Sequence, residues 1–168
     1  MTLSMYQASV PVFVRALGNL RHVLQTGEAF AADKGIAPDV LLHTRLIPDM
    51  LPLLQQVQIA ADTAARGSAR LAGVEPRAFP DEETTFAQLY ARIDGALEYI
   101  GGFTPAQIDG SETRAITLPL RSGELQFDGQ SYLLHYLLPN LFFHTTTAYD
   151  ILRQAGAPLG KADFLGRR

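Results

Sequence analysis

The sequence predicts an all-α fold, a four-helix bundle with a small β-hairpin between the third and fourth helices. Apolar residues recur at steps of three and four in four long segments, which is the period of a helix with one buried face. Between the third and fourth segments the period shortens to two, which is the period of a strand. The length of 168 residues fits one domain, so residues 1–168 are expected to form a single bundle.

The first helix is expected over about residues 6–26. Ser9 and Pro11 are residue types that suit a helix start or first turn, and Gly27 suits its end. The small, polar segment 30–36 leaves room for an extension. The inner face of this helix consists of Phe13, Leu17, Leu20 and Leu24.

The second long helix is expected to begin at Pro48, after a short helical turn at 38–42, and to end at Gly73. Pro52 falls within its first turns, where proline is tolerated. The inner face consists of Leu51, Leu54, Val57, Ala61, Ala64 and Ser68. A neighbouring stripe with the same period consists of Gln55, Ile59, Asp62, Arg66 and Ala69.

The third helix is expected to have Asp81 as its N-cap, and its apolar face runs from Phe86 to Ile100. Glu82 and Glu83 suit the positive end of the helix dipole. The pair Gly101–Gly102 ends the helix. The alternating segments 116–120 and 125–127 then form the hairpin, with its turn at Ser122–Gly123.

The fourth helix is expected over 131–155, with Pro139 kinking or splitting it. The tail 160–168 is expected to be an ordered loop, held by Phe164 and Leu165 packing against the bundle. The inward stripe of the fourth helix consists of Leu137, Leu141, His144, Ala148, Ile151 and Leu152.

Composition excludes several classes of protein and site. The formal net charge is −3 and no basic run occurs, so nucleic acid is not an expected partner. Cysteine is absent, which excludes disulfides, thiolate metal sites and a catalytic thiol. Neither a secretory signal nor an apolar run of about 20 residues occurs, so no membrane partner is expected and the location is predicted to be cytoplasmic.

His144 and Asp62 are the candidate catalytic residues. His144 lies on an apolar stripe, so its imidazole is either a hydrogen-bonded core group or a metal ligand or general base. Asp62 lies in the middle of a helix, where Arg66 at i+4 can pair with it. Alternatively, Asp62 lies opposite His144 and orients its imidazole or shares a metal.

Three further residues are candidate ligand-binding groups because they adjoin these two: Gln55, Gln58 and Tyr149. The other three histidines are weaker candidates for a functional site. His135 is nine residues from His144, so on a straight helix it faces the opposite side. His22 lies on a polar helix face and His43 lies in a connection, which favours surface or capping roles. Common nucleotide-binding, hydrolase and zinc-protease motifs are absent.

Six segments carry a family resemblance: SMYQASVPVF, RLIPDMLPLLQQVQIAADTA, ARLAGVE, DEETTFAQLYARI, YLLHYLLPNLFFHTTTAYDILRQAG and GKADFLG. Together they resemble a bacterial family labelled a domain of unknown function, in the DinB-like (YfiT-like) superfamily. The resemblance spans nearly the whole chain. It implies a DinB-like four-helix bundle that forms a homodimer.

The superfamily also includes metal-dependent thiol transferases and isomerases, so the resemblance implies zinc or nickel as a candidate cofactor. Their usual site has one histidine from the second helix and two, closely spaced, from the fourth. His144 matches one of these places, and Asp62 lies where the second helix supplies a ligand. Asn140 and Ala148 stand one turn from His144, so the three-histidine motif is incomplete.

Three functional hypotheses therefore stay open from the sequence. An enzyme would hold a metal on His144 and Asp62 and activate a thiol or water, as a transferase or hydrolase. A binding protein would hold a small ligand at the same core residues. A non-catalytic dimeric scaffold would use these residues only to satisfy hydrogen bonds in its core.

Overall fold

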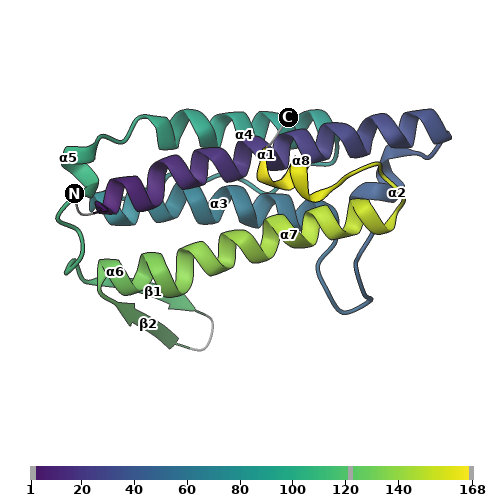
Figure 1. Cartoon of the computed structure of the whole chain (residues 1–168). Coiled ribbons are helices and arrows are strands. Elements are labelled where there is room, and N and C mark those ends of the chain that lie inside the picture. The colour runs from purple at the N-terminus through teal and green to yellow at the C-terminus, as the bar shows by residue number, and fades with distance from the viewer. Residues whose placement is uncertain (1–2, 121–122, 167–168) are drawn as a thin grey trace.

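Four long helices form the bundle in the computed structural model, which describes residues 3–120 and 123–166 (Figure 1). They are α1 (Met5–Lys34), α3 (Leu53–Ala72), α4 (Phe86–Gly101) and α7 (Leu138–Gln154). Short helices α2 (Pro38–His43), α5 (Pro105–Ile108), α6 (Gly129–Tyr132) and α8 (Lys161–Leu165) join or flank them. The predicted all-α bundle with a hairpin between its third and fourth long helices is confirmed.

The bundle is not a simple up-and-down series. α3 packs against both α4 and α7, and α1 packs against the same two helices. α3 and α4 run parallel, since both end near α5. The segment 73–85 must therefore return along the bundle before α4 begins, and we call it the crossover. Bundles with such a long crossover connection are a known variant of the four-helix architecture.

α1 begins earlier and ends later than the sequence indicated. Ser4 is the N-cap and accepts a hydrogen bond from the Gln7 backbone N–H at 3.3 Å. Ser9 lies inside the helix, where its hydroxyl donates to the Met5 carbonyl. Gly27 does not end α1: a Cβ there would lie 2.7 Å from the Leu152 side chain, so this glycine permits close packing of α1 on α7.

The predicted start of α3 at Pro48 is wrong. Pro52 has extended backbone angles (φ −70°, ψ 166°) and serves as the N-cap residue, so the helix begins at Leu53. A proline disfavours helical geometry in the residue before it, which explains why Leu51 stays outside. The end at Gly73 is confirmed, with the glycine in the left-handed region at φ 72°.

The predicted N-cap of α4 is also wrong. Thr85, not Asp81, caps the helix, and Gln88 completes a reciprocal capping box with it. Asp81 belongs to the crossover, where its carboxylate contacts Arg92. Aspartate and threonine can both cap a helix, and here the residue nearer the apolar run does so.

α6, a π-helical turn η1 (Leu133–Leu137) and α7 follow one another without a break. Together they correspond to the predicted fourth helix, which covers 129–154 here. In η1 the Leu138 N–H donates to the Leu133 carbonyl, five residues back. Pro139 follows directly and lacks an N–H, so the helix changes its period where the ordinary ladder is interrupted.

The hairpin lies at the α6 end of the bundle (Figure 1). Strands β1 (Ile116–Leu120) and β2 (Gly123–Phe127) are antiparallel, with Ile116 opposite Phe127 and Leu118 opposite Leu125. Ile116 and Leu118 are buried. The predicted turn residue Ser122 lies outside the described residues.

The tail is a short helix rather than a loop. α8 lies on α1, where Arg15 and Asn19 donate to the carbonyls of Leu165 and Phe164. His22 contacts Asp163 at 3.0 Å. The predicted packing of the tail is confirmed, although it depends on these polar contacts as well as on Phe164, which meets the ring of Tyr149.

The buried apolar side chains form one core cluster shared by all four long helices. Within residues 3–120 and 123–166, no helix has both the length and the apolar character that crossing a membrane requires.

Candidate functional site

Two side-chain hydrogen bonds join α3 to α7. His144 Nδ1 lies 2.7 Å from Gln56 Oε1, and Asn140 Nδ2 donates to Thr63 Oγ1 at 3.0 Å. Gln56 and Thr63 are two helical turns apart on α3, while Asn140 and His144 are one turn apart on α7. We call these four residues the α3–α7 seam.

The hydrogen bonds of Gln56 determine the tautomer of His144. Gln56 Nε2 donates to the Leu51 carbonyl at 2.9 Å, so its oxygen is the atom that faces His144 as an acceptor. His144 Nδ1 therefore carries the proton and Nε2 keeps its lone pair. Burial lowers the pKa of His144 below its ordinary value, because desolvation penalises the charged ring. The imidazole is thus neutral at pH 7.

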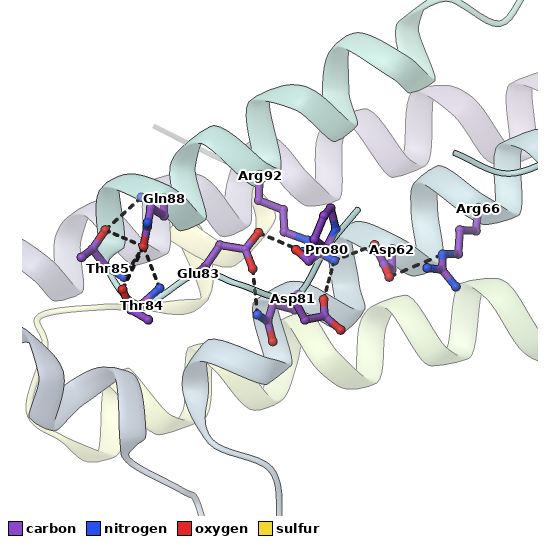
Figure 2. A network of polar contacts seen from close by, with 10 residues as sticks. Asp62, Arg66, Pro80, Asp81, Glu83, Thr84, Thr85, Gln88 and Arg92 are labelled. Atoms are coloured by element: carbon purple, nitrogen blue, oxygen red, sulfur yellow. Dashed lines mark hydrogen bonds and ion pairs between the residues drawn. The ribbon is translucent and has the colours of Figure 1, made fainter. Parts of the chain in front are cut away.

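A second polar group surrounds Arg92, whose side chain is only 1% exposed (Figure 2). Its Nη2 lies 2.8 Å from Asp62 and 2.9 Å from Asp81. Its Nη1 lies 2.9 Å from Glu83 and donates to the Pro80 carbonyl at 2.9 Å. We call Arg92 and these four partners the Arg92 cluster. It fastens the crossover to α3 and α4.

The carboxylates of this cluster have different environments. Burial raises the pKa of Asp62, although Arg92 and Arg66 act in the opposite direction. Burial acts on Glu83 too, but hydrogen bonds from Arg92 and Gln58 lower its pKa overall. Gln58 Nε2 donates to Glu83 at 2.8 Å. Two carboxyl groups held by one guanidinium thus have pKa values shifted in opposite directions.

The predicted site residues fall into separate places. Asp62 belongs to the Arg92 cluster and Gln58 contacts that cluster through Glu83, whereas His144 belongs to the seam. Gln55 is exposed, and Tyr149 lies farther along α7 with its ring 6.0 Å from that of Phe164. Asp62 pairs with Arg92 and, at 3.5 Å, with Arg66. No hydrogen bond or ion pair joins it to His144 in the described part of the chain.

Asp62 also faces a hollow of about 270 Å³ between α3, η1 and β1. Its polar lining consists of Asp62, Thr63, Arg66, Arg70, Tyr132, Tyr136 and Asn140. The rings of Tyr132 and Tyr136 stack with centroids 5.7 Å apart. One end of the seam, the π-helical turn and one carboxylate of the Arg92 cluster therefore meet at this inner hollow.

An outer hollow of about 510 Å³ adjoins the first and shares Arg66, Arg70 and Pro119 with it. It lies between α3, the start of the crossover and β1, with Arg114 and Glu75 on its walls. We call the two hollows together the hairpin cleft. Gly67 permits the close approach of η1 beside it, since a Cβ there would lie 2.6 Å from the Leu137 side chain.

A larger hollow of about 650 Å³ lies between α1, α7 and α8 and is mostly apolar. Its polar walls include Arg15 and Asn19, which already hold α8 by hydrogen bonds to backbone carbonyls. Because these two side chains already bind α8, the hairpin cleft is the better candidate site for a polar ligand.

Several of these residues were not identified from the sequence. Arg92 interrupts the apolar stripe of α4, three residues after Leu89 and four before Ala96, and this position was a usable indication of burial. Gln56 stands in the same relation to Leu53 and Ala60. Tyr132, Tyr136, Arg70 and Arg114 gave no such indication, because their meeting depends on where the hairpin folds.

The donor set does not fit the zinc or nickel site that the resemblance implied. His144 is the one imidazole in the seam, and its neighbours there are amides and a hydroxyl. Asp62 is already paired with two guanidinium groups. Nowhere in the described ranges do three histidine, aspartate or glutamate side chains converge as metal ligands.

The fold defines a class of protein, the DinB-like helical bundles. A DinB family member from Shewanella denitrificans, known from a crystal structure at 1.83 Å resolution, is 41% identical to this chain with a TM-score of 0.91. The match covers 97% of this chain and 92% of that one. Residues 5–165 match the family model described as Domain of unknown function (DUF1993), and the chain belongs to that family. A search of curated proteins finds no match.

Proposed function

We propose that this protein binds a small organic molecule in the hairpin cleft. The carrying observation is the convergence of charged, hydroxyl and amide side chains on one hollow of about 270 Å³. Small-molecule sites combine apolar walls with a few placed polar groups, and Leu118 and Leu137 supply such walls here. The proposal keeps Asp62 from the sequence prediction. In place of Gln55, Gln58 and Tyr149 it puts the other residues that line the cleft.

The seam has a supporting role in this proposal. Thr63 accepts from the Asn140 amide, and one turn along α7 His144 is fixed by Gln56. Both bonds hold α7 in one register on α3, so Asn140 keeps a defined position at the cleft wall. His144 acts on the ligand through this positioning rather than by contact.

Two further features favour the cleft as a binding site. A π-helical turn forms part of its wall, and such turns occur frequently at functional sites. Burial raises the pKa of Asp62 at its edge, and shifted carboxyl groups in clefts are concentrated at functional sites.

A blocking variant tests the proposal. Pro119 is exposed and lines both hollows, so Pro119→Trp places an indole in the cleft without cutting into the core. A thermal-shift screen of small acids, amines and neutral polar compounds should find ligands that stabilise the wild type but not this variant. The matched control is Thr146→Trp at an exposed position of α7. Equal ligand stabilisation of the wild type and Pro119→Trp would place binding elsewhere.

We also propose that the protein forms a homodimer. Val14 of α1 and Phe142 of α7 are 39% and 40% exposed and line the same apolar hollow. Exposed apolar surface of this kind is typical of protein contacts. Sedimentation equilibrium should give a dimer mass for the wild type and a monomer mass for the double variant Val14→Glu/Phe142→Glu. A wild-type monomer at all concentrations would refute this proposal.

A further inference from the structure

The hairpin cleft contains more cationic than anionic side chains. Arg66, Arg70 and Arg114 line its outer hollow, and Glu75 is the one carboxylate among the described lining residues there. Asp62 faces the inner hollow only, and its closer ion pair is with Arg92, which lines neither hollow. The protein as a whole has a formal net charge of −3, so this concentration of arginine is a local feature.

The three guanidinium groups have donors to spare. Arg70 Nη1 contacts the Tyr132 hydroxyl at 3.3 Å, and Arg114 donates to the Leu71 carbonyl. Neither lies within ion-pair distance of a carboxylate in the described part of the chain. Arg66 Nε is buried and has no hydrogen-bond partner there, although it lies 3.5 Å from Asp62. Since each guanidinium carries five N–H groups, most remain available.

Of these three arginines, Asp62 lies near Arg66 only, at 3.5 Å, so the repulsion among the arginines is not fully offset. Arg66 and Arg70 are one turn apart on the same face of α3, and like charges at this spacing repel. An oxyanion between them removes the repulsion, and carboxylate and phosphate oxygens match the planar fork of arginine. The protein as a whole has a net negative charge and the cleft is small, and both features disfavour a polyanion such as nucleic acid.

The apolar part of the cleft indicates what kind of molecule the anionic group belongs to. Beyond the arginines, the half-buried ring of Tyr136 and the exposed Pro119 form the accessible wall, whereas Tyr132, which stacks on Tyr136, and Leu118 are buried. The accessible wall suits the carbon skeleton of a ligand rather than a bare inorganic ion. We infer that the ligand is a small organic anion, a carboxylate or a phosphate monoester, whose charged end lies on Arg66, Arg70 and Arg114 and whose body lies against the ring of Tyr136. This inference rests on the proposed function and names its ligand class.

Three probes with the same aromatic body test it: benzoate, phenyl phosphate and the neutral benzamide. Titrations followed by NMR of the Tyr132 and Tyr136 ring resonances should give dissociation constants on the order of tenfold lower for an anionic probe than for benzamide. The anionic probe that binds more tightly identifies the oxyanion. Added salt should weaken that binding and leave benzamide unaffected.

Matched arginine variants identify the contact. Arg70→Gln should weaken the anionic probe on the order of tenfold, and Arg70→Lys, which keeps the charge but loses the fork, should be intermediate. Arg153→Gln, at an exposed position near the end of α7, should have no effect. If Arg70→Gln perturbs the fold, as judged by the amide spectrum, Arg66→Gln takes its place.

Each remaining outcome decides the question. If benzamide binds as tightly as both anionic probes, or if neither Arg70→Gln nor Arg66→Gln weakens the anionic probe, anion selection is refuted while the cleft remains a ligand site. Anion selection is refuted too if the thermal-shift screen with Pro119→Trp finds that the cleft binds a neutral or cationic ligand. If none of the three probes binds, the anion inference fails, and the wider screen with Pro119→Trp judges the proposed function separately.

Discussion

His144 is a buried group that stays neutral in the folded protein, and this has a consequence for stability. Above about pH 7 both the folded and the unfolded chain carry a neutral ring, so the titration of His144 does not make stability depend on pH there. Below about pH 6.5 the unfolded chain takes up a proton that the folded protein does not, because burial lowers the folded pKa. The contribution of His144 therefore lowers the free energy of unfolding as the solution is acidified through this range.

We predict that His144→Ala makes the free energy of unfolding less dependent on pH between 7.5 and 5. At pH 7.5 the same variant should be less stable by about 1–3 kcal/mol, since Gln56 loses its partner. Urea denaturation at several pH values measures both effects. His135→Ala, which removes an exposed imidazole, is the control. An unaltered pH slope in His144→Ala would contradict the assigned cause.

The spacing of polar residues along a helix explains which site residues could be predicted from the sequence. Asp62 and His144 were found because a polar group on a helical stripe is visible in the spacing. Their partners were not: Arg92 and Gln56 come from other elements, and only the packed bundle brings them to these two side chains. The residue at i+4, Arg66, was the one partner that helical geometry alone could name.

Among the elements, the crossover depends most on a single side chain. It runs beside α3 and α4, and Arg92 binds three of its residues, Pro80, Asp81 and Glu83. Removing the guanidinium leaves buried or half-buried carboxylates of Asp62 and Glu83 without compensation, which is the costly way to break an ion pair. The crossover should then separate from the bundle.

We predict that Arg92→Ala lowers the free energy of unfolding by about 3 kcal/mol, near the lower limit for buried pairs because Asp62 is partly exposed. Trypsin should also cleave after Arg77, within the crossover, much faster than in the wild type. Denaturant titration and timed proteolysis provide the two measurements. Arg153→Ala should change neither, and normal resistance at Arg77 in the Arg92 variant would refute the fastening role.

Helix boundaries show where element-level prediction succeeds and where it fails. Periodicity gave the helices themselves, because a buried face imposes its spacing on the sequence. The starts of α3 and α4 were misplaced because Pro48 and Asp81 are chemically acceptable at a helix start. Which candidate is used depends on the path of the preceding loop. For Asp81 that path is set by Arg92, a residue eleven positions further on.

At the scale of the whole molecule, the four long helices share one apolar core. A core of this kind has no internal boundary at which part of the chain could unfold alone. The prediction that residues 1–168 form a single domain therefore has a thermodynamic test.

We predict one cooperative unfolding transition. Tryptophan is absent, so the six tyrosines report tertiary structure by fluorescence, while far-ultraviolet circular dichroism reports the helices. The tyrosines are spread over α1, α4, the α6–η1 segment and α7, so both signals should change at the same temperature and denaturant concentration. Two separated transitions would indicate independent units.

The π-helical turn η1 amounts to one residue more than an uninterrupted α-helix would need between Tyr132 and Leu138. Deletion of a single exposed residue there, such as Leu134, would restore the ordinary helical ladder and leave α7 in register on α3. Tyr132 and the hairpin before it would also keep their places, because the shorter α-helix joins the same two ends. The extra residue is absorbed within this one turn, and its effect is confined to the wall of the cleft. A single codon can thus be gained or lost here without changing how the bundle packs on either side.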